Sequence, residues 1–175
     1  MEYAGNFLSM LFIGWMSVQD FRTRTITAWL LPTIGICLLV GEMSAISTSR
    51  LLENALVNYA LLAMQFFLLW LWISLRNRRW INVLNTQIGL GDIFLLICIA
   101  PAFSPFNFFL FYTLGALAAI VIHLTMTMID EKTQDRIPLA GILGIPLILM
   151  CVVRIIAPQN FVIASDVWAI NMLMP

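Results

Sequence analysis

The sequence predicts an all-α, polytopic membrane protein, and three observations lead to that fold class. Hydrophobic residues make up 62% of the 175 residues and charged residues only 10%, a composition far from that of a soluble domain. The apolar residues fall in long runs, and a membrane-spanning helix needs roughly 20 of them. The length allows about six spans and leaves no room for a soluble domain, so we expect a single membrane-embedded domain over residues 1–175.

Six apolar segments can be placed along the chain. Their expected bounds are 4–19, 28–46, 53–75, 93–103, 106–127 and 138–156. The fourth and fifth form one run that is interrupted at Pro101, Ser104 and Pro105; proline breaks helical hydrogen bonding, which predicts a hairpin. The fourth segment has about 11 residues, or roughly 17 Å of helix. It is short for a bilayer core of about 30 Å, so we expect Asp92 to lie below the membrane surface.

The basic residues predict an orientation. Seven of the nine Lys and Arg residues lie in the loops after the first, third and fifth segments, and only Arg50 and Arg154 lie on the other side. Because loops rich in Lys and Arg stay in the cytoplasm, we expect a multi-pass protein of the inner (cytoplasmic) membrane with its N-terminus outside. The first segment follows no basic n-region and is expected to be retained as a span.

The remaining composition excludes several classes of function. A formal net charge of zero indicates no nucleic-acid partner. Cys37, Cys98 and Cys151 are widely separated and set among apolar neighbours, which fits neither a disulfide framework nor a zinc site. We therefore expect no metal and no cofactor. The sequence does not indicate an oligomeric state or the residues that bind a substrate.

Several polar residues have a simple structural interpretation. His123 is expected to be a packing residue within the fifth segment. Glu42 and Glu53 flank the predicted outer loop, where a solvated or interfacial position accounts for them. The tail, residues 157–175, is expected outside, with apolar residues such as Ile163 at the interface.

Asp20 and Asp92 are the candidate catalytic residues. A carboxylate at membrane depth costs roughly 2.5–3.5 kcal/mol on insertion scales, and these two lie on the same predicted side, one at the end of the first segment and one just before the fourth. Two adjacent carboxyl groups share a proton, so they can act as base and acid on one water molecule, as in aspartyl proteases. Alternatively, Asp20 only marks the interface and Asp92 only caps a helix.

The helix macrodipole predicts how the two carboxyl groups divide their roles. Asp92 begins a helix, where the positive end favours a carboxylate, and Asp20 ends one, where the negative end favours the protonated acid. We therefore expect Asp92 to be the ionised member of the pair. Gly89 and Gly91 precede Asp92, and residues without a Cβ are expected to let the backbone turn sharply and a substrate approach closely.

These residues resemble the motifs of one family of membrane proteases. The stretch from Asp20 to Ile26 looks like the D-x-R-x-x-x-I stretch of type IV prepilin peptidases, and the stretch from Gly89 to Asp92 looks like their G-x-G-D motif. Ile137 and Pro138 resemble the I-P segment that begins their last helix. Order and spacing agree over about 140 residues, since the matches run from Asp20 to the sixth segment.

The resemblance implies a membrane aspartic endopeptidase with Asp20 and Asp92 as its catalytic pair. Such an enzyme removes the leader peptide of type IV prepilins or pseudopilins at the cytoplasmic face, in pilus assembly or protein secretion. The chain lacks the C-x-x-C insertion of longer members, so it is similar to the minimal Flp-type prepilin peptidases and archaeal preflagellin peptidases, and no methyltransferase activity is expected. It departs from the family at Thr27 and Ala28, where Pro-Asn is usual, and at Phe94, where Lys is frequent.

Two alternatives come from other classes of function. Buried carboxylates also serve as proton relays, so a small proton-coupled transporter is the main alternative. A transporter predicts acids near the midplane and repeated or broken helices, whereas both aspartates here are expected at one face. A noncatalytic assembly factor is the third possibility, and the presence of both aspartates argues against it.

Overall fold

The computed structural model describes residues 2–77, 89–129, 139–157 and 161–166. Within these ranges it contains six α-helices, one short 3-10 helix and no strand, which confirms the all-α class. The helices are α1 (Glu2–Thr23), α2 (Leu30–Glu42), α3 (Thr48–Asn77), α4 (Leu90–Ile99), η1 (Ala100–Ala102), α5 (Pro105–Ile129) and α6 (Leu139–Ile156). Each expected segment corresponds to one helix, with shifts of a few residues at the ends.

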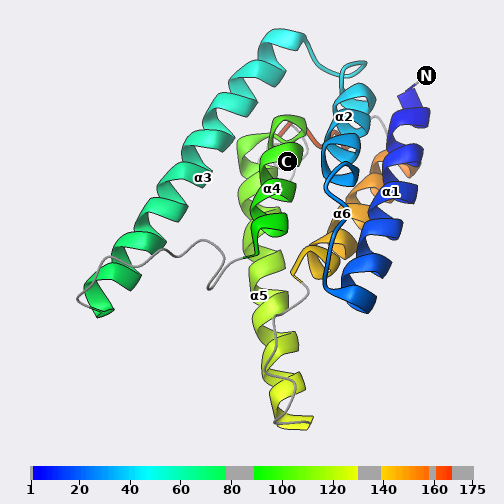
Figure 1. Ribbon diagram of the computed structural model, residues 1–175. Helices are drawn as coiled ribbons and strands as arrows, with labels where there is room; N and C mark the ends of the chain where they lie inside the picture. Colours follow the sequence, from blue (N-terminus) through cyan, green and yellow to red (C-terminus); the bar gives the residue numbers. More distant parts are fainter. Residues whose placement is uncertain (1, 78–88, 130–138, 158–160, 167–175) are drawn as a thin grey trace, which may run out of the picture.

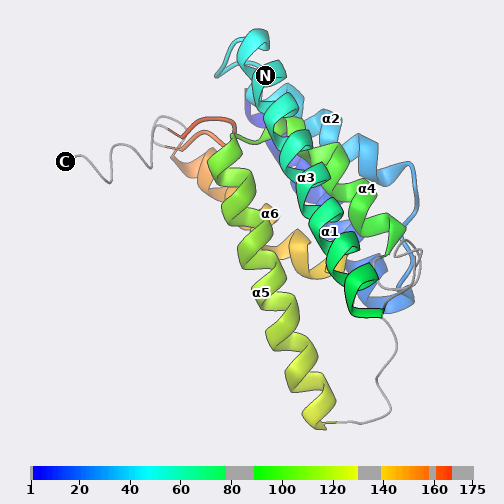
Figure 2. The same cartoon turned by 90° about the vertical axis from the view of Figure 1, so that its left-hand side faces the viewer.

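The helices alternate in direction along the chain (Figure 1). α1, α3 and α5 end at one end of the bundle, which we call the aspartate end, and α2 finishes at the opposite end, which we call the Glu42 end. α1 packs against both α2 and α6, and α4 packs against α2. α5 extends beyond the start of α6 toward the aspartate end (Figure 2), so the first turn of α6 lies within the depth of the bundle.

Three helical stretches are long and apolar enough to cross a membrane: Thr48–Asn77, Pro105–Ile122 and Leu139–Ile156. Two shorter apolar stretches, Leu30–Glu42 and Leu90–Ala102, pack beside them. With their exposed apolar surfaces, these helices make the chain a helical membrane protein.

The side chains of α1 are also arranged as expected for a helix surrounded by lipid. Its polar residues Asn6, Ser9, Ser17 and Asp20 are buried. Its exposed residues include Phe7, Leu8, Leu11, Trp15 and Val18. A helix that buries polar groups and exposes apolar ones reverses the pattern of a water-soluble surface helix, and this reversal fits lipid as the surrounding solvent.

The predicted hairpin between the fourth and fifth segments is confirmed. α4 passes into η1 and α5 begins at Pro105. The break frees backbone carbonyl groups, which need partners inside a membrane protein. The buried Asn58 side chain on α3 supplies two donor contacts, to Ala100 O at 2.8 Å and to Phe103 O at 2.9 Å. This contact ties α3 to the bundle at the point where the chain reverses.

Candidate active site

Asp20 lies near the end of α1 with only 5% of its surface exposed. α1 packs against α6 at this level, and the backbone N–H of Gly141 donates a hydrogen bond of 2.7 Å to Asp20 Oδ2. Gly141 belongs to the first turn of α6, where backbone N–H groups have no partner within the helix. Asp20 therefore occupies an anion-binding position at the start of α6.

Asp92 lies in the first turn of α4, after Gly89 as the N-cap residue. Its carboxyl group takes a hydrogen bond from the backbone N–H of Ala140 and feels the negative charge of Asp20. Ala140 and Gly141 are consecutive residues, so adjacent amides of α6 each face one carboxyl group. The structure thus brings together two aspartates that lie on separate helices, both beside the start of α6.

The surroundings raise the pKa of both carboxyl groups, which lie outside the expected spans 4–19 and 93–103. Burial raises the pKa of Asp20, and the Gly141 N–H and the Arg24 charge oppose that rise. Burial, and then the charge of Asp20, raise the pKa of Asp92 to about 6, against the Ala140 N–H. Asp92 is therefore the member of the pair that keeps its proton to the higher pH, up to about 6.

This order reverses the expectation from the macrodipoles of α1 and α4. That expectation considered only the helix that carries each aspartate. The Asp20 carboxyl group, although it ends α1, faces the positive end of α6 through Gly141, and it also lies near the Arg24 charge. These favourable contacts make Asp20 the carboxyl group of the pair that ionises at the lower pH.

The two glycines before Asp92 differ in their structural role. Gly89 has an extended backbone with φ −65° and ψ 131°, which any residue can adopt, and no described glycine has a positive φ. The expected sharp turn is therefore not the reason for glycine here. A Cβ at Gly89 would lie 2.7 Å from Asp92 Oδ2, whereas one at Gly91 would lie 3.4 Å from Ile26 Cδ1, an ordinary contact. Gly89 makes room for the Asp92 carboxyl group.

The α1–α2 connection is held by Gln19 and Thr27. Gln19 Nε2 donates to Thr27 Oγ1 at 2.7 Å, and the Thr27 backbone N–H donates to Gln19 Oε1 at 3.3 Å. Thr27 stands at one of the departures from the prepilin peptidase pattern. Its hydroxyl and amide fasten this connection to α1 next to Asp20, which gives the departure a local structural role.

Phe94 stands at the other departure, and it lies away from the carboxyl pair. Residues two positions apart in an α-helix point about 200° apart, and Phe94 is 42% exposed. The side chain at position 94 thus projects from the opposite face of α4 to Asp92. Ile137 and Pro138 lie outside the described residues.

No metal-binding group of three or more His, Cys, Asp and Glu side chains occurs in the described part of the chain. The cysteines are free thiols.

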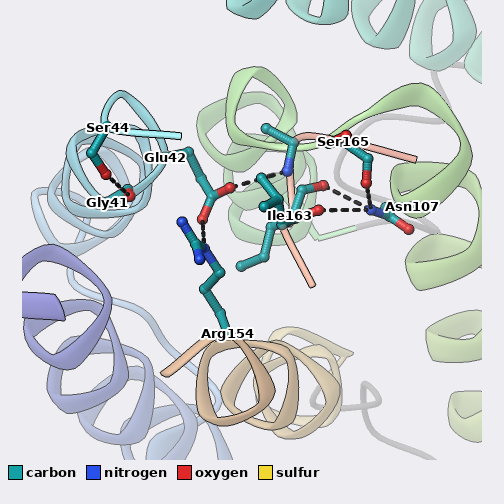
Figure 3. Close-up of polar contacts among 9 residues, drawn as sticks. Gly41, Glu42, Ser44, Asn107, Arg154, Ile163 and Ser165 are labelled. Carbon is teal, nitrogen blue, oxygen red and sulfur yellow. Dashed lines mark hydrogen bonds and ion pairs between the residues drawn. The ribbon is translucent and has the colours of Figure 1, made fainter. Parts of the chain in front are cut away.

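A second buried carboxyl group, which the sequence analysis placed wrongly, lies at the Glu42 end. Glu42 was expected to be solvated or interfacial, but none of its surface is exposed. Arg154 Nε of α6 donates to Glu42 Oε1 at 3.1 Å, and the Ala164 N–H donates to Glu42 Oε2 at 3.2 Å. Figure 3 shows Glu42 reaching between Arg154 and the segment 161–166.

The segment 161–166 is also buried more deeply than expected. Ile163 was expected at the membrane interface, but its side chain has no exposed surface. Asn107 Nδ2 donates to the carbonyl groups of Ile163 at 2.9 Å and Ser165 at 3.2 Å (Figure 3). Asn54 Nδ2 donates to Ala164 O at 3.0 Å.

The sequence did contain a signal for the burial of Glu42. Arg154 lies inside the apolar run 138–156, and a charge in such a run needs a buried partner.

No family model, no curated protein and no solved structure matches the chain. The fold and the site define its class: a helical membrane protein that holds a pair of interacting carboxyl groups at one end of its bundle.

Proposed function

We propose that the chain is a membrane aspartic endopeptidase of the prepilin peptidase type. One observation carries this proposal: the carboxyl groups of Asp20 and Asp92 are held by consecutive backbone amides of α6. Two interacting carboxyl groups with separated pKa values are the arrangement that activates water in aspartic proteases. The motifs around the two residues, which resemble those of prepilin peptidases, point to the same chemistry.

The two carboxyl groups have distinct roles in the proposed reaction. Asp20, ionised, takes a proton from water as the water oxygen attacks the peptide carbonyl carbon, while Asp92 gives its proton to the carbonyl oxygen. The resulting gem-diol collapses with cleavage of the C–N bond. The leaving nitrogen takes the proton held by Asp20, and a hydroxyl proton of the gem-diol returns to Asp92. The cycle ends with both groups in their starting states.

The distribution of exposed charge supports a cytoplasmic position for this site. Arg22, Arg24 and Arg76 are exposed at the aspartate end. At the Glu42 end Arg50 is exposed, but Arg154 is buried in its ion pair and adds nothing to the surface charge. Exposed basic charge is therefore more abundant at the aspartate end, which supports a cytoplasmic position for that end. We propose a multi-pass protein of the cytoplasmic membrane with its N-terminus outside.

The proposed substrate is a prepilin or pseudopilin, a protein with a short basic leader before an apolar helix. Exposed arginines at the aspartate end would repel a basic leader, so they orient the chain in the membrane and do not hold the leader. Cleavage at the junction of leader and helix would place the scissile bond near the membrane surface, at the level of the carboxyl pair.

Cleavage tests this proposal directly. The wild-type chain is co-expressed with prepilin-like proteins that carry a basic leader and an apolar helix, and the new N-terminus is mapped by mass spectrometry. Asp20→Asn and Asp92→Asn should each lower cleavage by roughly 10³-fold or more. Glu53→Gln, which changes a 65% exposed carboxylate at the other end, should leave it unchanged. Cleavage that persists in both aspartate variants would overturn the proposal.

The transporter alternative gains one observation from the structure. Glu42 is a second buried carboxyl group, at the opposite end of the bundle from Asp20. Both of its oxygens accept hydrogen bonds, from Arg154 and from the Ala164 amide, which favours a fixed structural pair over a proton relay. Proton uptake into vesicles that contain the purified chain, lost in Glu42→Gln, would favour transport; an assembly factor would show neither uptake nor cleavage.

A further inference from the structure

α1 and α6 contact each other directly where Asp20 meets Gly141. A Cβ added at Gly141 would lie 3.2 Å from Asp20 Oδ2 and 3.2 Å from two ring atoms of Phe21. Contacts this short are tighter than nine in ten that real Cβ atoms make. Any side chain at position 141 would therefore displace the carboxyl group or the ring, and the 2.7 Å hydrogen bond from the Gly141 N–H depends on the missing Cβ.

One helical turn further along α6, Gly144 makes a different contact with α1. A Cβ at Gly144 would overlap Ser17 Oγ, which lies one turn before Asp20. Gly144 therefore lets the two helices approach, whereas Gly141 contacts the carboxyl group itself. The two positions separate helix packing from the placement of Asp20.

We propose that Gly141 is a positioning residue for the reaction, whose N–H holds the Asp20 carboxylate beside Asp92 as the group that accepts the proton from water. The catalytic part of this inference rests on the proposed function, whereas the placement of Asp20 does not. The charged groups that face Asp20 are Arg24, which follows α1, and Asp92 on α4, and α6 contributes the amide. Loss of the amide contact leaves burial as the unfavourable influence on the Asp20 anion, with only the Arg24 charge to oppose it.

Gly141→Ala is the central test. The Asp20 carboxyl stretch is titrated by infrared difference spectroscopy in an Asp92→Asn background, so that one carboxyl group of the pair remains. We expect the pKa of Asp20 to rise by about one unit, since a hydrogen bond to a buried carboxylate favours its charged form. In the chain with Asp92 intact, the acid limb of the kcat profile should move up by the same amount, so that kcat falls about tenfold at a pH on that limb and changes little at neutral pH.

Two glycine variants serve as controls. Gly14→Ala adds a Cβ on α1 with no atom within 4 Å and should leave the pKa of Asp20 unchanged. Gly144→Ala disturbs the same helix contact through Ser17, so it should lower the melting temperature and shift the pKa of Asp20 less than Gly141→Ala does. An equal shift from both variants would show that packing, and not the amide, controls Asp20, and it would overturn the proposal.

If Gly141→Ala does not fold, a double variant that also removes the crowding side chain of Phe21 keeps the test decisive. Phe21 is 47% exposed, so Phe21→Ala is tolerated, and it removes the ring atoms next to the new Cβ. Phe21→Ala with Gly141→Ala should fold and still raise the pKa of Asp20 above that of Phe21→Ala alone. An unchanged pKa would overturn the positioning role. A raised pKa in a chain whose wild type cleaves no prepilin-like protein would instead contradict the proposed function and leave the placement of Asp20 standing.

Discussion

The two ends of the bundle both bury carboxyl groups but treat them differently. At the Glu42 end, one carboxylate meets one guanidinium at 3.1 Å, and a backbone amide satisfies its second oxygen. At the aspartate end, two carboxyl groups face each other and share the amides of one helix start. A matched ion pair has no proton to exchange, whereas two neighbouring acids share one. Incomplete compensation of the buried carboxyl groups is what makes the aspartate end, and not the Glu42 end, the candidate site.

The largest effect that would sharpen this comparison is expected at Arg154. Arg154→Met leaves Glu42 buried without its cation, and breaking a buried pair in this way costs about 3–5 kcal/mol of unfolding free energy. Adding Glu42→Gln should restore most of that loss, because no unpaired charge remains. Thermal unfolding in detergent measures both variants. Equal stability of the single and double variants would show that the pair is not coupled.

At the aspartate end, removal of a buried carboxyl group should stabilise the chain, and the effect should depend on pH. The pKa of Asp92 is raised from 3.8 to about 6, so its contribution to stability is complete below pH about 4 and is lost as the pH rises through about 6. Asp92→Asn should remove this dependence and stabilise the chain at pH 7 by on the order of 2 kcal/mol. The wild type and the variant are compared by unfolding at several pH values, and parallel curves would contradict the raised pKa.

The glycines before Asp92 test the geometry of the carboxyl pair. Gly89→Ala places a Cβ 2.7 Å from Asp92 Oδ2, so the carboxyl group must move, and we expect roughly tenfold slower cleavage. Gly91→Ala makes an ordinary contact with Ile26 and should stay within about threefold of the wild type. The two initial rates are compared on one prepilin-like substrate. The reverse order would show that the glycines serve backbone freedom and not room for Asp92.

The assignment of base and acid predicts the order of two pKa values. With Asp20→Asn only Asp92 of the pair titrates, and with Asp92→Asn only Asp20 does. Burial remains the main influence on Asp92, while the Gly141 amide and Arg24 favour the Asp20 anion, so infrared titration should give Asp92 the higher pKa. A higher value for Asp20 would restore the order that the macrodipoles of α1 and α4 predict.

The smallest expected effect comes from Arg24. This residue follows α1 with a φ of 51°, a left-handed conformation that costs less for glycine. Arg24→Gly should raise stability by roughly 0.5 kcal/mol and, because it removes a cation near Asp20, should also raise the pKa of Asp20. Thermal unfolding and infrared titration measure the two effects. Lower stability would show that the Arg24 side chain outweighs the backbone strain.

The helices were predictable from the sequence because helices that face lipid require long runs of apolar residues. Each apolar run became one helix, and the prolines at 101 and 105 marked the break between α4 and α5. Both aspartates could be selected because an acid beside an apolar run needs a reason. These features are local, so a short window of sequence contains them.

The features that were predicted wrongly depend on contacts between distant segments. Glu42 ends an apolar run beside turn residues, and its partner Arg154 lies 112 positions away. The Gly141 amide that favours the Asp20 anion lies 121 positions from it. Neither the neutralisation of Glu42 nor the order of the two acids could be derived from the helix that carries each residue, because the deciding groups belong to α6.

The Glu42–Arg154 pair also has a consequence for how the chain enters the bilayer. α2 is synthesised before α6, so the carboxylate is present when the guanidinium arrives. An isolated charge costs roughly 2.5–3.5 kcal/mol to insert at a helix centre, and a waiting counter-ion reduces that cost. We expect α6 to insert into the bilayer together with α2, so that a nascent chain halted before α6 would keep an uncompensated acid at Glu42.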